Sequence, residues 1–166
     1  MVKIIEKEIA KLLIERKWTL ATAESCSGGL LAHRLTNIPG SSAYFLCGYI
    51  TYSNQSKIEL LGVNPKTIEN YGSVSAQTAI EMAKGARQRT KVTFAVSVTG
   101  IAGPGGATPT KPVGLVYLGL SSPEETLSQQ FNFTGKRLAV KLQTTQSALT
   151  FLKEYISSYR VNNSRT

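Results

Sequence analysis

The sequence predicts an α/β fold in one domain, with a mixed, mostly parallel sheet and helices on both of its faces. In the first half of the chain, short apolar runs rich in β-forming residues alternate with segments of helical periodicity. In the second half, two such runs follow one another without a helix between them, which makes the sheet mixed. The length of 166 residues fits a single domain with one sizeable core.

The first half of the chain supplies two strands, each between helices. Residues 3–17 carry Ile and Leu at helical spacing with Lys and Glu between them, which predicts an amphipathic helix. Residues 18–23 are an apolar run and predict a buried strand. A turn of small polar residues then leads into a helix over 27–36, which a Pro-Gly pair ends. Residues 43–52 are rich in β formers and predict the second strand.

Three helices are expected next. Ser53 and Asn54 cap a short helix over 55–61, and Pro65 suits the first turn of another. Ser75 caps a longer helix whose apolar stripe is made mostly of small residues, so this helix packs close to its neighbour. The residues of the stripe are Ala76, Ala79, Ile80, Ala83 and Ala86.

The second half of the chain is organised around a glycine-rich loop over 100–112. Residues 92–99 before it predict a central strand, and residues 113–120 and 126–133 after it predict two more. The loop contains neither a Walker A pattern nor a dinucleotide fingerprint. Loops of this length in a compact domain are usually functional or disordered, and we interpret this one as the rim or lid of a site.

The last predicted helix begins at Thr134-Gly135, with Thr134 as its cap, and the domain extends over residues 1–160. Lys136 and Arg137 place two cations where the helix dipole is already positive, which is unfavourable unless an anion binds there. Arg137 with the free N–H groups of this end is therefore a candidate seat for a phosphate or carboxylate. Two solvated basic residues are the alternative interpretation. Residues 161–166 form a polar tail.

Composition excludes several classes of function. The net charge is +9, but the charges are spread along the chain without a run of five and without interleaved aromatic residues. This distribution argues against nucleic acid as the partner. No apolar run reaches the length of a membrane span, and the first residues mix charges, so we expect no membrane association and a cytoplasmic location.

Few residues are available for a metal site or for a Ser-His-Asp triad. Two cysteines, Cys26 and Cys47, do not make a Cys-rich zinc site, and no cluster has metal-ligand spacing, so we expect neither a metal nor a cofactor. His33 is the only histidine, and it lies about two helical turns beyond Ser25. It is therefore a poor general base for Ser25.

Polar residues follow three of the predicted strands at the point where each strand ends. They are Glu24-Ser25-Cys26-Ser27, Thr51-Tyr52-Ser53-Asn54 with Lys57 one turn later, and Thr99-Gly100. Because ligands of open α/β sheets bind beyond the carboxyl ends of parallel strands, we expect these clusters to share one site. The alternatives are a capping serine, a half-buried strand tyrosine and an exposed helix lysine.

Ser25 and Lys57 are the candidate catalytic pair. A serine hydroxyl is a weak nucleophile until a base takes its proton, and lysine can do so when burial or neighbouring cations lower its pKa. Tyr52 and Thr99 are candidates to relay protons or to orient the serine. Small residues would let backbone N–H groups approach a developing oxyanion or the substrate. These candidates are Ser27, Gly28, Gly29 and Gly100.

Three stretches together resemble the CinA C-terminal domain family, and the resemblance covers nearly the whole chain. They are Ala23-Glu-Ser-Cys-Ser-Gly-Gly29, Gly48-Tyr-Ile-Thr-Tyr-Ser-Asn-Gln-Ser-Lys57 and Thr99-Gly-Ile-Ala-Gly-Pro-Gly-Gly-Ala-Thr-Pro-Thr-Lys-Pro-Val-Gly114. The family's fold is a three-layer α/β/α sandwich with a mixed sheet. Its characterised members are nicotinamide-nucleotide amidases, which hydrolyse the carboxamide of nicotinamide mononucleotide and need no metal.

The resemblance implies roles for single residues. It makes Ser25 the nucleophile, Lys57 its base, and Tyr52 and Thr99 active-site residues, and it places the nucleotide phosphate at Arg137. The sequence departs from the family's pattern at three positions. Ser27 stands where threonine is commoner, Ala107 where glycine is frequent, and Lys136 where aspartate often precedes the arginine.

The function expected from this resemblance is hydrolysis of nicotinamide mononucleotide to nicotinate mononucleotide and ammonia. A binding module that holds a pyridine nucleotide without chemistry, or an amidase for another small amide, are the alternatives. As partners we expect the small-molecule substrate and further copies of the chain in a homo-oligomer.

Overall fold

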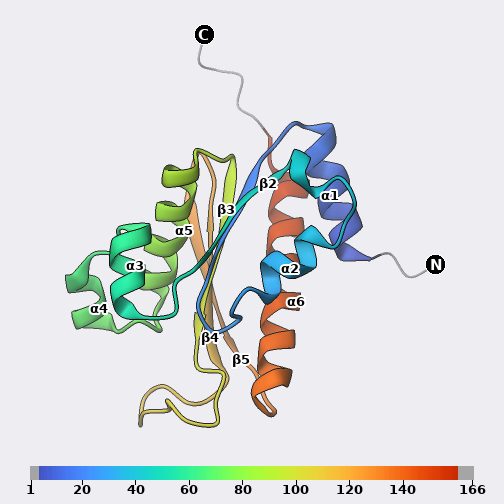
Figure 1. Ribbon diagram of the computed structural model, residues 1–166. Helices are drawn as coiled ribbons and strands as arrows, with labels where there is room; N and C mark the ends of the chain where they lie inside the picture. Colours follow the sequence, from blue (N-terminus) through green and yellow to red (C-terminus); the bar gives the residue numbers. More distant parts are fainter. Residues whose placement is uncertain (1–3, 161–166) are drawn as a thin grey trace.

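The computed structural model describes residues 4–160, so the predicted polar tail over 161–166 lies outside the described residues. A five-stranded sheet forms the middle layer of the molecule (Figure 1). Its strands are β1 (Leu20–Glu24), β2 (Phe45–Ile50), β3 (Phe94–Gly100), β4 (Leu115–Ser121) and β5 (Thr126–Asn132). The spatial order is β2-β1-β3-β4-β5.

The sheet is mixed and mostly parallel, as predicted. β1 pairs in parallel with both β2 and β3, whereas β3 with β4 and β4 with β5 pair antiparallel. Only β4 therefore runs against the other described strands. The two strands that follow the glycine loop, β4 and β5, pair with each other antiparallel, as their direct succession in the sequence indicates.

Helices cover both faces of the sheet, which confirms the three-layer α/β/α sandwich (Figure 1). One face carries α1 (Ile5–Glu15), α2 (Leu30–Thr36) and α6 (Arg137–Ser158). The other face carries α3 (Asn54–Leu61), α4 (Pro65–Tyr71) and α5 (Ala76–Thr90). No helix within residues 4–160 combines the length and the apolar character that crossing a membrane requires.

The two faces of the sheet pack differently. Large side chains from α1, α2 and α6 fill the first, including the fully buried Ile9 and Leu31. On the second face α5 lies close to the sheet through small residues, as its alanine stripe predicts. A Cβ at Gly119 of β4 would lie 2.3 Å from the carbonyl oxygen of Ala79. Likewise, a Cβ at Gly85 would lie 1.8 Å from the carbonyl oxygen of Leu61, so glycine is required at both contacts.

Element boundaries differ from the predictions by one to three residues at several ends. β1 begins two residues later than predicted, after Lys17 takes a left-handed φ of 53°. α6 begins at Arg137, and Lys136 is its N-cap without a side-chain hydrogen bond. The prediction that Thr134 caps this helix is therefore wrong. The Thr134 carbonyl instead accepts a hydrogen bond from Gln143 Nε2 at 2.8 Å.

The carboxyl ends of the three parallel strands are held side by side. The Ser25 N–H donates to the Val98 carbonyl at 2.9 Å, which extends the β1–β3 pairing past the end of β1. The Thr51 N–H donates to the Glu24 carbonyl at 2.8 Å, which does the same for the β1–β2 pairing. The polar residues after all three strands therefore meet at one edge of the sheet.

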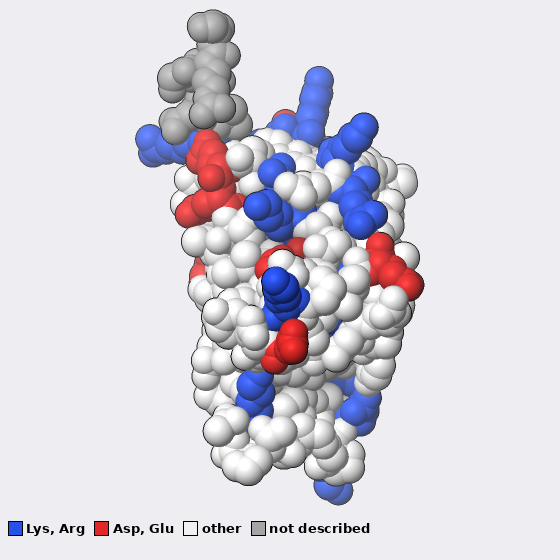
Figure 2. All heavy atoms as spheres, turned by 90° about the vertical axis from the view of Figure 1, so that its left-hand side faces the viewer, with Lys and Arg blue, Asp and Glu red and all other residues white. Residues whose placement is uncertain are grey.

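Basic side chains are spread over the face that α3, α4 and α5 form, with acidic ones between them (Figure 2). They gather most at the upper end in this view, the end at which α5 terminates (Figure 1). The last turn of α5 carries Arg87 and Arg89. This gathering lies at the opposite end of the molecule from the glycine loop.

Candidate active site

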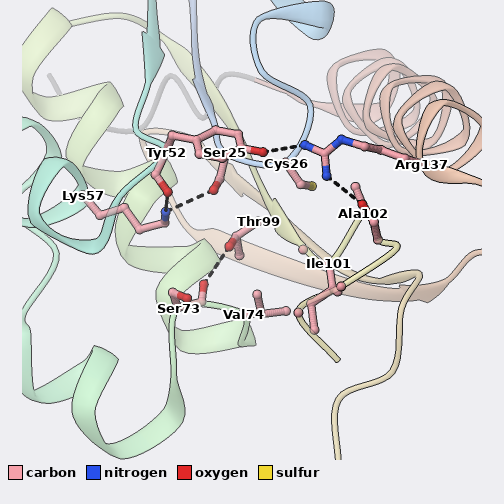
Figure 3. A pocket seen from close by; sticks show the side chains of 14 residues that line it. Ser25, Cys26, Tyr52, Lys57, Ser73, Val74, Thr99, Ile101, Ala102 and Arg137 are labelled. Carbon is pink, nitrogen blue, oxygen red and sulfur yellow. Dashed lines mark hydrogen bonds between the residues drawn. The ribbon is translucent and has the colours of Figure 1, made fainter. Parts of the chain in front are cut away.

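The clusters after the three parallel strands border one pocket of about 220 Å³ (Figure 3). The glycine loop, the connection between α4 and α5, and the first residue of α6 complete its wall. Its lining residues are Ser25, Cys26, Tyr52, Lys57, Ser73, Val74, Thr99, Gly100, Ile101, Ala102, Gly103, Gly105, Gly106 and Arg137. The predicted residues Ser25, Tyr52, Lys57, Thr99, Gly100 and Arg137 are therefore brought together.

Ser25 and Lys57 are hydrogen-bonded inside this pocket. Lys57 Nζ lies 3.1 Å from Ser25 Oγ, although the residues come from the β1–α2 turn and from α3 (Figure 3). Lys57 also donates to the carbonyl oxygens of Thr51 at 2.8 Å and Tyr52 at 3.4 Å. Three oxygens around one amine hold it in place beside the serine.

Lys57 is buried without a carboxylate to pair with. Its residue is 1% exposed, and none of the salt bridges between described residues includes it. Burial disfavours the charged form and lowers the pKa of Lys57 to about 8. About a tenth of the amine is then neutral at pH 7, far more than for an exposed lysine, and a neutral amine can accept a proton.

Tyr52 reaches the pair through its main chain and not through its phenol. Its hydroxyl accepts a hydrogen bond from Arg137 Nη2 at 2.6 Å, and Arg137 Nη1 donates to the Gly103 carbonyl at 2.8 Å. The guanidinium thus bridges the segment after β2 and the glycine loop across the mouth of the pocket (Figure 3). Sequence reasoning expected the phenol to orient Ser25, whereas the structure turns it toward Arg137.

Thr99 is fully buried at the end of β3, and its hydroxyl points away from the catalytic pair. Thr99 Oγ1 donates to the Ser73 carbonyl at 2.6 Å. It therefore fixes the α4–α5 connection, which adds Ser73 and Val74 to the pocket wall. The sequence marked this connection only as a helix cap, so its part in the pocket was missed.

The start of α2 is closed by a buried carboxylate, which overturns the expectation of free N–H groups there. Glu24 is fully buried, and its side chain accepts hydrogen bonds from the N–H groups of Gly29, Leu31 and Ala32 at 2.8–3.0 Å. The sequence signal was an acidic residue directly before the turn into a helix, where the helix dipole favours a negative charge.

Ser27, Gly28 and Gly29 lie outside the pocket lining, although the sequence suggested that they hold the substrate. Gly28 and Gly29 have φ angles of 61° and 95°, which let the chain turn sharply from β1 into α2. Ser27 is fully buried. The structure thus gives the glycines a turn-forming role.

Cys26 lines the pocket directly after Ser25. Burial raises the pKa of its thiol to about 12, so it is protonated near neutral pH and a weak nucleophile. Its backbone N–H makes no hydrogen bond to another residue within 4–160. Its own thiol interacts with this backbone N–H, which partly offsets the effect of burial on the thiol pKa.

The glycine loop is tied to the opposite wall of the pocket. Lys111 Nζ donates to the carbonyl oxygens of Tyr71 at 2.5 Å and Val74 at 2.7 Å. At the other end of the loop Gly100 packs against β4, where a Cβ would lie 2.6 Å from Val116 Cγ2. The loop forms the rim of the pocket, as predicted, and Lys111 sets how far it stands from the α4–α5 connection.

The described residues offer little support for a histidine base or for a metal ion at this site. His33 is exposed on α2 and outside the pocket lining, as its spacing from Ser25 predicts. No group of three or more His, Cys, Asp or Glu side chains suited to a metal ion occurs within the described part of the chain. A serine with a buried lysine is the chemistry that the pocket offers.

Comparison with known proteins identifies the family of the chain. The sequence matches the CinA C-terminal domain over residues 2–156. The chain belongs to the CinA C-terminal domain family.

A CinA-like protein of Chloroherpeton thalassium is 47% identical over 158 residues, which are 93% of this chain and 38% of that protein. A relative from Halothermothrix orenii is 54% identical over 150 residues, 90% of this chain and 36% of that protein. The chain thus spans less than two-fifths of these curated relatives.

Solved structures of the family share the whole fold. The competence/damage inducible protein CihA from Agrobacterium tumefaciens superposes with a TM-score of 0.87 at 40% identity, covering 93% of this chain and 96% of that one. The competence damage-inducible protein A from Klebsiella pneumoniae superposes with a TM-score of 0.91 at 31% identity, covering 94% and 97%. The family expected from the three motifs is confirmed.

Proposed function

We propose that the chain hydrolyses the carboxamide of nicotinamide mononucleotide, giving nicotinate mononucleotide and ammonia. The observation that carries this proposal is the 3.1 Å contact between Lys57 Nζ and Ser25 Oγ in a pocket where the lysine is buried and unpaired. A serine beside a lysine of lowered pKa is a nucleophile with its base. Membership in the CinA family supports the choice of substrate.

The reaction begins with the neutral amine of Lys57. The amine accepts the proton of the Ser25 hydroxyl as Oγ bonds to the amide carbon, and the carbonyl electron pair moves to the oxygen. In this proposal the backbone N–H of Cys26, the residue after the nucleophile, stabilises the oxyanion, a contribution worth roughly 3–4 kcal/mol per donor. Lys57 then returns the proton to the amide nitrogen as the C–N bond breaks, and ammonia leaves. Water hydrolyses the resulting ester at Ser25 by the same route.

The pocket suits a flat carboxamide with a phosphate at its rim. Its volume of about 220 Å³ lies below the roughly 300–1,000 Å³ of pockets that enclose whole drug-sized ligands. The ring and carboxamide would thus fill the interior, and the phosphate would lie at the mouth. Arg137 bridges the mouth there, and a guanidinium can bind a phosphate through two parallel hydrogen bonds.

Replacing the nucleophile tests the proposal directly. We expect wild type to release ammonia from nicotinamide mononucleotide and Ser25→Ala to lose at least about 10³-fold in kcat, because an activated serine carries the covalent step. Binding of the mononucleotide to Ser25→Ala, measured by calorimetry, should remain within a few-fold of wild type. Equal rates of ammonia release from both proteins would contradict the role of Ser25.

A panel of small amides separates the remaining alternatives. Turnover of another carboxamide in preference to the mononucleotide would keep the Ser25–Lys57 pair and change the substrate. Tight binding of the mononucleotide without ammonia release would instead indicate a module that holds the nucleotide. In both cases the panel uses the same ammonia assay, with Lys57→Met as the inactive reference.

The lowered pKa of Lys57 predicts the pH dependence. The neutral amine is the active form, so kcat/KM should rise about tenfold per pH unit below pH 8 and level off above it. The measurement is a pH–rate profile from pH 6 to 9.5 at constant ionic strength. A flat profile between pH 6.5 and 8.5 would exclude Lys57 as the base.

A further inference from the structure

The pocket holds positive charge that no acidic side chain balances. Of its 14 lining residues, Lys57 and Arg137 are the cationic ones, and none is Asp or Glu. Glu24 directly precedes Ser25, but its carboxylate is bound to three N–H groups at the start of α2. An additional positive charge inside this pocket is therefore repelled by Lys57 and Arg137, and no carboxylate among the lining residues offsets that repulsion.

The groups that contact the Lys57 amine directly are neutral, and the charges of Glu24 and Lys141 act on the neighbouring Cys26 from farther away. The β1–α2 turn contributes the Ser25 hydroxyl and the protonated Cys26 thiol, and the segment after β2 contributes two carbonyl oxygens. From β3, Thr99 contributes a hydroxyl that is bound to a carbonyl. From α6, Arg137 adds a permanent positive charge at the mouth. The charge of Lys57 is thus the one that can respond to a ligand.

A carboxamide in position for attack carries its ring close to this amine. Its carbon must lie within about 3–3.5 Å of Ser25 Oγ, and the ring is bonded to that carbon, so the ring charge lies roughly 6–8 Å from Lys57 Nζ. Nicotinamide nucleotides have a positively charged pyridinium ring. At this distance, and with Lys57 buried, a second positive charge lowers the pKa of the amine by about one to two pH units.

We propose that the positive ring of a bound pyridinium carboxamide expels the proton of Lys57, so that the substrate itself generates the base that activates Ser25. The proton leaves to solvent, and the amine keeps the electron pair with which it then accepts the Ser25 proton. This inference rests on the proposed function and adds a requirement to it. The positive charge of the ring, and not only the carboxamide, selects the substrate.

Calorimetry on the Ser25→Ala variant tests the inference without turnover. The two ligands are nicotinamide mononucleotide and benzamide riboside 5′-monophosphate, which has the same carboxamide, ribose and phosphate on a neutral benzene ring. Binding enthalpies in two buffers of different ionisation enthalpy at pH 7.5 give the number of protons released. We expect the pyridinium ligand to release about half a proton more per site than the neutral one, as a shift of one pH unit requires.

The matched control is Ser25→Ala with Lys57→Met, in which the difference between the ligands should vanish. A second measurement on wild type does not depend on these variants. The pH of half-maximal kcat for the mononucleotide should lie about one unit below that of kcat/KM, because kcat reports the bound enzyme.

Three outcomes decide between this inference and the proposed function. Equal proton release with both ligands, from a protein that does release ammonia from the mononucleotide, would overturn the inference and leave the function standing. A wild-type protein that releases no ammonia would overturn the function itself. A proton difference that persists in the Lys57→Met background would also overturn the inference, since the proton would come from another group.

Discussion

Two helices, α2 and α6, begin near the pocket, and they differ in whether a side chain of the protein accepts hydrogen bonds from their first N–H groups. At α2 the buried carboxylate of Glu24 accepts three backbone N–H groups. At α6 the N-cap residue Lys136 makes no side-chain hydrogen bond, the first turn contains no acidic residue, and Arg137 follows directly. Both starts carry the positive end of a helix dipole, but only at α2 does a described residue neutralise it.

The difference distinguishes a structural helix start from one suited to a ligand. A carboxylate that is covalently part of the chain saturates α2, so this helix offers no N–H groups to a substrate. At α6 Arg137 lies at the mouth of the pocket, and the helix start beside it has no side-chain cap. In the proposed function the phosphate of the mononucleotide supplies the negative charge that α6 lacks. The two starts should therefore respond differently to substitution.

The largest expected effect is the loss of stability on removing the carboxylate at α2. Glu24→Ala leaves one buried and two partly buried N–H groups without an acceptor, which should cost about 3–5 kcal/mol of unfolding free energy. Urea unfolding followed by circular dichroism measures the change. Glu24→Gln retains one acceptor oxygen and should lose less. A Glu24→Ala protein within about 1 kcal/mol of wild type would show that the carboxylate is not what completes α2.

The role of Glu24 also shows where prediction from sequence ends. Apolar periodicity and β-forming runs were sufficient to predict the helices and strands in the right order, because these patterns follow from burial on one face or two. The meeting of Ser25 with Lys57 followed from a rule of topology, namely that parallel strands end at the same edge.

The direction in which each side chain points, and therefore its hydrogen-bond partner, could not be predicted from sequence patterns and strand order. Position at a strand end does not say which acceptor a hydroxyl will choose. Thr99 and Tyr52 line the pocket, but the hydroxyl of Thr99 binds the Ser73 carbonyl and that of Tyr52 binds Arg137. Both partners come from segments distant in sequence, so only the packed structure identifies them. The same holds for Glu24, whose carboxylate turns forward onto the next helix.

A smaller effect, confined to binding, is expected at the start of α6. Arg137 is exposed, so Arg137→Met should leave the unfolding free energy nearly unchanged. It removes the guanidinium from the proposed phosphate position, which should raise KM for nicotinamide mononucleotide about 10- to 100-fold with a smaller change in kcat. Steady-state ammonia release measures both constants.

Nicotinamide riboside, which lacks the phosphate, is the control ligand for this substitution. Its KM should be high for wild type and almost unaffected by Arg137→Met. If the substitution raises KM equally for the riboside and the mononucleotide, Arg137 acts on the shared part of the ligand or on the loop through Gly103, and the phosphate assignment fails.

The smallest expected effect concerns the N-cap of α6, where Lys136 makes no side-chain hydrogen bond. It tests whether the missing cap leaves the N–H groups of this helix start to a ligand. Lys136→Asp introduces a carboxylate at the N-cap of α6. An aspartate at this position accepts a backbone N–H and complements the dipole, so unfolding free energy should rise by about 1 kcal/mol. The same negative charge beside the proposed phosphate position should raise KM for the mononucleotide a few-fold.

Lys136→Ser separates the two contributions, because a neutral cap should give much of the stability without the electrostatic cost to binding. Thermal unfolding and ammonia release on the three proteins measure both quantities. If Lys136→Asp gains no stability, α6 is already complete and the contrast with α2 disappears. If it gains stability and lowers KM, the aspartate assists binding, and the site at α6 depends on Arg137 rather than on the summed positive charge.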